Sequence, residues 1–386
     1  MSQFKATFRI TLSIFGFFTI LGISSCSAPD NTNPLLLALS SENPKIKQVM
    51  DSLDQYEIQI RYTRIDRKND SVFFTDYDFQ VDENQYFYPA STVKFPAAIV
   101  TLEKLNTIDT LDMDSRFYVE GDSVETTFAK ALSEIFAVSD NAANNRLIEF
   151  LGQDELNKRI MEKKVGKIRV AHRLSTSNAD DVTTKPLVIY LDDSTTVSST
   201  SIINTPPKAL MLDGIKKGSG FYAGDSLFQE PFDFSFKNYY PIATQHNVLK
   251  RIIFPDAFPE EERFDLTNRQ LLVLKEAMSS LPGQLGYDEE EFYDSYVKFL
   301  LFGDTTEPIP DYFKIFNKVG YAYGTLTDCA YIQDSKNNVD FMVTATILVN
   351  KDGIFSDDAY DDDEIGIPFL AELGRALYAI ELKRTQ

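Results

Sequence analysis

Three short segments of the chain hold residues that together can carry out acyl transfer. They are Ser91-Thr92-Val93-Lys94, Ser139-Asp140-Asn141 and Lys318-Val319-Gly320, in this order. A serine hydroxyl becomes a nucleophile when a neighbouring base takes its proton, and lysine and serine side chains can carry that proton. A further lysine supplies positive potential for an anionic group. The combination predicts a site that forms a covalent acyl-enzyme.

The first segment opens a predicted helix that continues through Phe95-Pro96-Ala97-Ala98-Ile99. Ser91 and Lys94 are three residues apart, so they lie on one helical face, one turn apart. Lys94 can act as the base only if burial or positive charge lowers its pKa from about 10.4. Amides at the helix N-terminus would then stabilise an oxyanion. The alternative is that Ser91 only caps the helix and Lys94 is a surface charge.

The other two segments are also placed at structural boundaries. Ser139-Asp140-Asn141 precedes an amphipathic helix that ends at Gly152, and all three residue types are good helix caps. A capping role without catalysis is therefore the alternative interpretation. Lys318-Val319-Gly320 lies in a predicted strand and is followed by Tyr323-Gly324-Thr325-Leu326-Thr327-Asp328.

Taken together, the segments resemble the S-x-x-K, S-D-N and K-[ST]-G motifs of class A β-lactamases and penicillin-binding proteins. The similarity extends into the Y-G-T-x-x-D pattern after the third motif, and it covers about residues 45–386 apart from a middle stretch. The resemblance implies a serine hydrolase of β-lactamase-like fold. Its substrate would be a small-molecule or peptide amide, either a β-lactam or a cell-wall peptide, which acylates Ser91 with Lys94 as general base.

The same resemblance implies roles for the remaining motif residues. Ser139 would relay a proton to the leaving nitrogen, Asn141 would hydrogen-bond the substrate amide, and Asp140 would be structural. Lys318 would attract a substrate carboxylate, and Gly320 would let the strand edge approach the ligand. The resemblance implies no metal and no cofactor.

The chain departs from the class A pattern in its third motif and in its deacylation loop. Val319 replaces the hydroxyl residue that normally binds the substrate carboxylate. Class A enzymes also carry E-x-x-L-N after S-D-N, whose Glu activates the deacylating water. The nearest string, at residues 153–157, begins with Gln and belongs to the next predicted helix. The loop at residues 169–181 has no Glu, although Asp180 or Asp181 can be considered as substitutes.

These departures leave three functions open. The first is a β-lactamase-like hydrolase, whose deacylation can be slow. The second is a penicillin-binding or D,D-peptidase-like acyl transferase. The third is a binding module without turnover, for which Phe232, Phe234 and Phe236 would suit an exposed patch. Alternate Phe residues are more often the core-facing side of a strand.

The N-terminus resembles a bacterial lipoprotein signal. A basic start precedes an apolar run from Ile10 to Ile23, which is too short to span a membrane. The following Ile-Ser-Ser-Cys resembles a lipobox, which predicts cleavage after residue 25 and lipidation of Cys26. Residues 26–44 would form a flexible tether to the membrane, facing the periplasm or cell exterior. An ordinary signal peptide with an incidental Cys is the alternative.

Composition narrows the possible partners and metal sites. The formal net charge is −20, which argues against a nucleic-acid partner. His172 and His246 are the two histidines, so a His-based metal site is not expected. The acidic run at residues 361–364 lacks the spacing of a calcium loop and suits a helix N-terminus. Cys329 lies in an apolar run, which predicts a buried structural thiol.

The order of predicted elements indicates an α+β fold. A helix opening at Asn43-Pro44 and a hairpin of residues 57–65 and 71–81 come first. Three strands, at residues 312–319, 325–334 and 339–349, precede a closing helix. We therefore expect a discontinuous sheet domain, residues 45–105 and 305–386, around a mainly helical domain, residues 106–304. Within the latter, residues 183–236 form a distinct extra segment.

Overall fold

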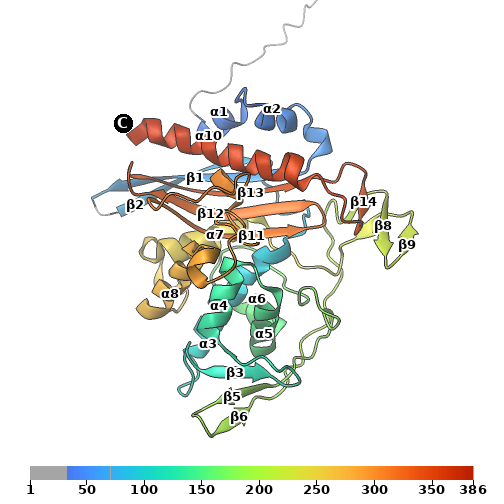
Figure 1. Cartoon of the computed structure of the whole chain (residues 1–386), viewed down its shortest axis with the longest axis vertical. Helices are drawn as coiled ribbons and strands as arrows, with labels where there is room; N and C mark the ends of the chain where they lie inside the picture. Colours follow the sequence, from blue (N-terminus) through green and yellow to red (C-terminus); the bar gives the residue numbers. More distant parts are fainter. Residues whose placement is uncertain (1–32, 70, 386) are drawn as a thin grey trace, which may run out of the picture.

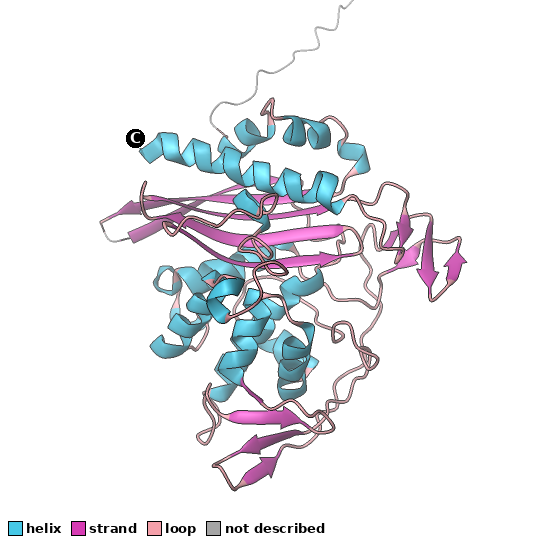
Figure 2. Cartoon of the chain, in the orientation of Figure 1, coloured by secondary structure: helices cyan, strands magenta, loops and turns pink. Residues whose placement is uncertain are grey.

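The computed structural model describes residues 33–69 and 71–385, and its centre is one antiparallel sheet built from both ends of the chain (Figures 1 and 2). The strand order is β11-β12-β13-β1-β2, so β1 joins the N-terminal hairpin to the C-terminal strands. The strands are β1 (Ile58–Lys68), β2 (Ser71–Phe79), β11 (Phe313–Ala322), β12 (Thr325–Asp334) and β13 (Val339–Leu348). The predicted α+β class and the predicted sheet are confirmed.

Helices from both termini cover one face of this sheet (Figure 1). They are α1 (Pro34–Leu39), α2 (Pro44–Met50) and α10 (Ile367–Thr385), with η1 (Leu53–Gln55) leading into β1 and η6 (Asp362–Gly366) leading into α10. Asn43 caps α2 through its side chain, as predicted. The predicted tether of residues 26–44 needs correction, because α1 buries Leu35 and Leu39 in this layer. Residues 1–32, with the predicted signal peptide and Cys26, lie outside the described residues.

The helices of the opposite layer pack around a second hydrophobic core. They are α3 (Lys94–Leu105), α4 (Phe128–Ala137), α5 (Asn141–Leu151), α6 (Gln153–Glu162), α7 (Ile242–Ile253) and α8 (Asn268–Ser279). The short helix α9 (Phe299–Phe302) instead packs against α10, and its buried residues belong to the core shared by α10 and the sheet. Short helical turns connect these helices: η2 (Ala90–Val93), η3 (Pro255–Ala257), η4 (Glu260–Glu262) and η5 (Pro282–Leu285). The predicted boundary at residue 105 places α3 with the sheet, whereas α3 packs against α5 and α6. Because α3 is apolar on nearly all sides, it is stable only when other elements surround it.

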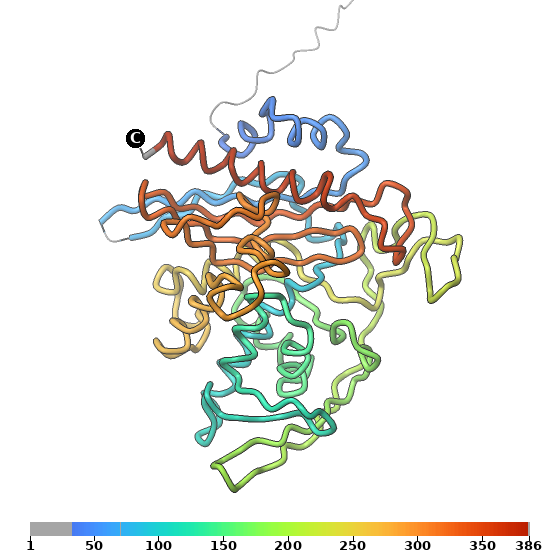
Figure 3. The backbone as a smooth tube through the Cα atoms, viewed as in Figure 1, coloured from blue at the N-terminus to red at the C-terminus, as the bar shows by residue number. Residues whose placement is uncertain are grey.

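The predicted extra segment, residues 183–236, is built from short strands. Two of them join a four-stranded sheet at the far end of the helical layer: β3 (Arg116–Val119), β4 (Thr126–Thr127), β5 (Leu187–Tyr190) and β6 (Thr196–Ser198). The chain then runs back along the side of the molecule (Figure 3). There it forms β7 (Lys216–Lys217), β8 (Gly220–Ala223), β9 (Ser226–Phe228) and β10 (Phe232–Asp233), with β14 (Ile354–Phe355) pairing β8.

Several smaller predictions can be compared with this structure. Phe234 is buried and contacts the ring of Phe232, as expected for a core-facing pair, but Phe236 is 57% exposed. Cys329 is a buried free thiol, as predicted, and burial raises the pKa of its thiol. No helix in the described part of the chain is long and apolar enough to cross a membrane. Among the same residues, no group of His, Cys, Asp or Glu side chains is arranged to hold a metal.

Candidate active site

Ser91 lies in the turn η2, directly before the buried helix α3. The prediction put Ser91 at the first turn of the helix, whereas α3 itself begins at Lys94. Ala90 adopts a left-handed backbone conformation, with φ of 46°, and the amide of Thr92 donates to the carbonyl of Pro89 at 3.1 Å. Ser91 remains partly exposed and lines two cavities at once. It is therefore accessible to a substrate from both sides.

Lys94 is fully buried at the start of α3. Its ammonium donates to the carbonyl of Ser139 and, at 3.2 Å, to the hydroxyl of the same residue. Burial lowers the pKa of Lys94 to about 7, and the nearby Asp140 opposes that shift. A substantial fraction of Lys94 is therefore neutral at neutral pH, which is the state required of a general base.

Ser139 is held in the turn between α4 and α5, with a φ of 57°. Its hydroxyl accepts a second hydrogen bond from Lys318 Nζ at 2.8 Å. Asp140 caps α5 by accepting from the amide of Ala143 at 2.6 Å, which agrees with the structural role expected for it. The cap fixes the turn that aims Ser139 at the two lysines.

Lys318 is buried in β11 and directs its ammonium at the S-D-N turn. It donates to Ser139 Oγ and, at 2.9 Å, to its neighbour's carbonyl at Val319. Burial lowers the pKa of Lys318 well below its usual value, the proximity of Lys94 lowers it further, and Asp328 opposes the shift. The first, second and third motifs therefore meet through three side chains: Lys94, Ser139 and Lys318.

A buried polar network behind Lys318 escaped the sequence analysis. Lys298 Nζ donates to Asn317 Oδ1 at 2.6 Å and to the carbonyls of Met278 and Ile315 at 2.8 and 3.1 Å. Asn317 in turn donates to Asp328 Oδ1 at 2.8 Å. Burial lowers the pKa of Lys298 to about 7 and raises that of Asp328 to about 6. The only signal in the sequence was Asp328, the last residue of the Y-G-T-x-x-D pattern.

Gly320 lies directly against the turn that carries Ser91. A Cβ atom at this position would lie 2.5 Å from the carbonyl oxygen of Pro89 and 3.0 Å from Thr92 Cγ2. The missing side chain thus lets β11 press against the turn that carries Ser91, and the space is filled by protein. Gly320 therefore positions the turn that carries Ser91, and the predicted approach of the strand edge to a ligand stays a prediction.

The two cavities meet at Ser91, Asn141 and Tyr321. The larger has a volume of about 670 Å³, and its wall includes Tyr88, His172, Lys237, Tyr323 and Asp358. The smaller has a volume of about 450 Å³ and lies on the side of Ser139 and Val319. Asn141, at the start of α5, reaches both, consistent with the substrate contact predicted for it.

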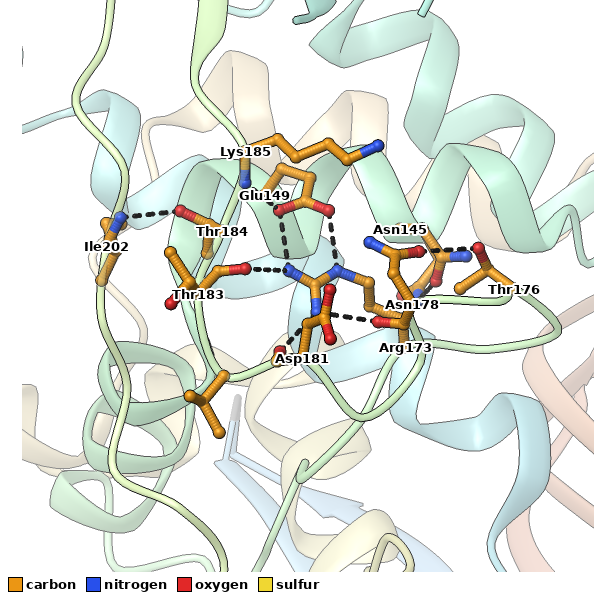
Figure 4. Close-up of polar contacts among 12 residues, drawn as sticks. Asn145, Glu149, Arg173, Thr176, Asn178, Asp181, Thr183, Thr184, Lys185 and Ile202 are labelled. Atoms are coloured by element: carbon orange, nitrogen blue, oxygen red, sulfur yellow. Dashed lines mark hydrogen bonds and ion pairs between the residues drawn. The ribbon is translucent and has the colours of Figure 1, made fainter. Parts of the chain in front are cut away.

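One wall of the larger cavity belongs to a loop clamped by a buried ion pair (Figure 4). The guanidinium of Arg173 binds both oxygens of Glu149 on α5, at 2.7 and 2.8 Å. It also donates to the carbonyls of Asn178, Asp181 and Thr183, at 3.4, 2.7 and 3.1 Å. One side chain thus fixes the path of the whole loop. Neither Arg173 nor Glu149 was singled out from the sequence.

This loop is where class A enzymes would hold their deacylation base. Residues 153–157 begin α6, so the Gln-containing string belongs to a helix, as predicted. Asp180 and Asp181 are exposed and do not line the larger cavity; Asp358 is the carboxylate that does so among the described residues.

His172 also faces this cavity, but both of its ring nitrogens are engaged. Nδ1 lies 2.6 Å from the carbonyl oxygen of Arg173, and Nε2 accepts from the amide of Asn238 at 3.3 Å. Burial lowers the pKa of His172, so the ring is neutral. These contacts hold the imidazole as a wall of the cavity, and they leave no free nitrogen to activate a water.

Comparison with known proteins agrees with this geometry. The model of the beta-lactamase enzyme family matches residues 44–214, which hold Ser91, Lys94, Ser139 and Asn141. No curated protein sequence matches significantly. Among solved structures, a beta-lactamase from Burkholderia phymatum aligns with a TM-score of 0.50 and 13% identity, covering 86% of this chain and 96% of the other. The structure of L2 complexed with relebactam aligns with a TM-score of 0.50 and 11% identity, covering 91% and 99%.

The solved structures are too distant in sequence to show more than the fold. The matched family segment carries the first two motifs, and the structure brings the third motif, from β11, against them. Residues 44–214, a little under half of the chain, match the model of the beta-lactamase enzyme family, and the chain shares the fold of these β-lactamase structures.

Proposed function

We propose that the protein forms a covalent acyl-enzyme at Ser91, with Lys94 as the general base. The observation that supports this most strongly is the environment of Lys94. Its amine is buried, it contacts the Ser139 hydroxyl at 3.2 Å, and its pKa lies near 7. A lysine with this pKa can accept and release a proton at neutral pH, which an exposed lysine cannot do.

In the proposed reaction the Ser91 oxygen attacks the substrate carbonyl as its proton passes to Lys94. The resulting tetrahedral intermediate collapses, the carbon–nitrogen bond breaks, and the leaving nitrogen takes up a proton from Lys94 through Ser139. The acyl group is then an ester of Ser91, and both lysine and serine side chains have regained their starting protonation. Attack by water on this ester would release the acid and restore the hydroxyl of Ser91.

Release of the acyl group is the slow step of this proposal. Among the residues that the structure describes, no glutamate lines the larger cavity, and both ring nitrogens of His172 are engaged. Without a well-placed base, the water has to attack unaided, which costs a general-base contribution of about 10²–10⁴ in rate. A long-lived acyl-enzyme also suits the second candidate function, a penicillin-binding or D,D-peptidase-like acyl transferase, in which an amine replaces water.

The substrate we propose is a β-lactam or a related cell-wall peptide amide, met outside the cytoplasm. The family match supports the β-lactam, and the lipobox-like segment before Cys26 supports export and a lipid anchor in a bacterial membrane. A non-catalytic binding module is the third candidate, favoured by Val319 in place of a hydroxyl residue.

Labelling with a fluorescent penicillin separates the catalytic candidates from the binding module. We expect the purified protein to keep the label through denaturing electrophoresis, because an ester bond survives unfolding. Ser91→Ala should abolish labelling, and Ser133→Ala, a partly buried serine on α4 away from both cavities, should retain it. Equal labelling of the parent and Ser91→Ala would contradict the proposal.

A further inference from the structure

The smaller cavity beside Ser91 has an acidic and aromatic wall. Three carboxylates line it, from Asp140, Asp362 and Asp363, and no Lys or Arg does so among the described residues. Three phenol rings complete the wall, from Tyr293, Tyr296 and Tyr321. A cavity of this composition repels anions and attracts cations.

Asp362 is the member of this wall whose environment points to a missing partner. It is only 6% exposed, at the start of η6, and its Oδ1 atom is buried without a hydrogen-bond partner among the described residues. A buried carboxylate oxygen without a donor is unfavourable. Tyr321 hydrogen-bonds the same carboxylate, and burial raises the pKa of Asp362 to about 6, so a cationic N–H donor beside it would stabilise its charged form.

The lysines next to the cavity do not make its wall positively charged. Neither Lys318 nor Lys94 lines the cavity: both are buried, Lys318 donates to Ser139 Oγ and the carbonyl of Val319, and Lys94 donates to Ser139. Val319 itself presents an apolar side chain where a hydroxyl would help to hold a carboxylate. The anion anchor expected from the sequence is therefore withdrawn from the cavity surface.

The aromatic residues are arranged to accept a cation. The rings of Tyr293 and Tyr296 lie 6.1 Å apart at 84°, so they present differently oriented surfaces to the cavity. Ring faces attract ammonium groups, and the effect adds to that of a neighbouring carboxylate. Tyr293 lies near Asp363. Burial and this carboxylate raise the pKa of Tyr293, so the phenol stays neutral.

We propose that the smaller cavity binds a positively charged ammonium group on the leaving-group side of the substrate. This rests on the proposed function, because Ser139, the group that would protonate the leaving atom, lines the same cavity. The preferred substrates are then amides or esters whose leaving group bears an amine, and a carboxylate at that position is disfavoured.

Three thioesters of benzoylglycine test this preference. Each leaving thiol is a six-membered ring of similar size, and the three differ in charge. They are 4-mercaptopiperidine, which is cationic, cyclohexanethiol, which is neutral, and 4-mercaptocyclohexanecarboxylate, which is anionic. All three place the same acyl group on Ser91, so intact mass follows each acylation rate with one product. We expect the piperidine thioester to react about tenfold faster than the neutral one, and the anionic one to react slowest.

The double variant Asp362→Asn, Asp363→Asn should bring the cationic and neutral rates to within about twofold of each other. Asp363→Asn alone, at an exposed position, keeps the test valid if the double variant does not fold. Glu364→Gln removes the same charge one residue further on, outside the cavity wall, and should retain the preference. Rates that do not depend on ring charge, or a preference that survives the double variant, would overturn the inference.

Calorimetric titration of Ser91→Ala with the same three thioesters separates this inference from the proposed function. Tighter binding of the piperidine thioester without acylation of the parent would support the ammonium site and overturn the acyl-enzyme. Acylation of the parent without a charge preference would support the acyl-enzyme and overturn the ammonium site.

Discussion

Lys94 and Lys318 donate hydrogen bonds to the same oxygen, the hydroxyl of Ser139, at 3.2 and 2.8 Å. One lysine comes from the helix that follows the nucleophile and the other from an edge strand of the sheet. Two ammonium groups so close together disfavour each other's charged form, and burial acts in the same direction. The shared acceptor therefore joins three motifs into one path for a proton.

The first prediction concerns the pH dependence of acylation. Lys94 can take the Ser91 proton only when it is neutral, and its pKa is lowered to about 7. The acylation rate should therefore rise with pH and level off above about 7, falling about tenfold for each pH unit below it. Stopped-flow or quenched-flow acylation by a penicillin between pH 5 and 9 measures this profile. A flat profile would exclude Lys94 as the base.

Replacement of the base provides the second prediction. Lys94→Met should lower the acylation rate by about 10²–10⁴. The variant should be at least as stable as the parent in chemical denaturation, because it removes the cost of burying a charge. Loss of activity together with loss of the fold would instead mean that Lys94 is a structural residue.

The site could be predicted from the sequence because its motif residues are polar, lie close together in the chain and stand at the ends of helices and strands. Ser91 and Lys94 are neighbours in the chain, and Ser139-Asp140-Asn141 begins a helix, so local rules were sufficient. Their contact with β11 could not be derived locally, since it spans 179 residues between Ser139 and Lys318. Resemblance to a family provided that contact.

Other parts of the site lacked any local signal. Arg173 and Glu149 look like ordinary charged residues, and only the folded loop makes them a buried pair. Lys298 is a single lysine in an aromatic-rich stretch, yet it reaches three acceptors in the core. Gly320 was singled out for its approach to a ligand, and the structure shows its close packing against Pro89 and Thr92. In each case the role of the residue depends on its tertiary contacts, which the periodicity of the sequence does not reveal.

The third prediction tests the close approach at Gly320. Gly320→Ala should destabilise the protein by about 1–3 kcal/mol and slow acylation, because its methyl group would push β11 away from the Ser91 turn. Gly121→Ala is the control: a methyl group there has free space around it, although φ is 85°. The control should lose only the backbone term, about 1 kcal/mol, and should keep its acylation rate. Normal acylation by Gly320→Ala would contradict the assigned role.

The fourth prediction concerns the clamped loop. Glu149→Gln leaves the Arg173 guanidinium buried without its anion, which should cost about 3–5 kcal/mol of stability. Hydrogen exchange should increase at residues 174–184 before it does so in the sheet. Asp114→Asn breaks an exposed ion pair with Arg269 and serves as the control, with no measurable change expected. Equal exchange in both variants would show that the pair does not hold the loop.

The fifth prediction returns to the departure at Val319. Val319→Thr adds a hydroxyl to the wall of the smaller cavity and should speed acylation by a penicillin, which carries a carboxylate, by up to about tenfold. The gain should be absent for a neutral thioester with the same variant. A uniform change for both substrates would point to repacking and not to recognition of the carboxylate.

The most direct test of the account is an intact-mass time course of the purified protein with a penicillin, beside Ser91→Ala. The account predicts an increase equal to the mass of the penicillin, located on the peptide that contains Ser91, that decays slowly and is absent from the variant. An adduct on another residue, or an adduct that forms equally on Ser91→Ala, would contradict it.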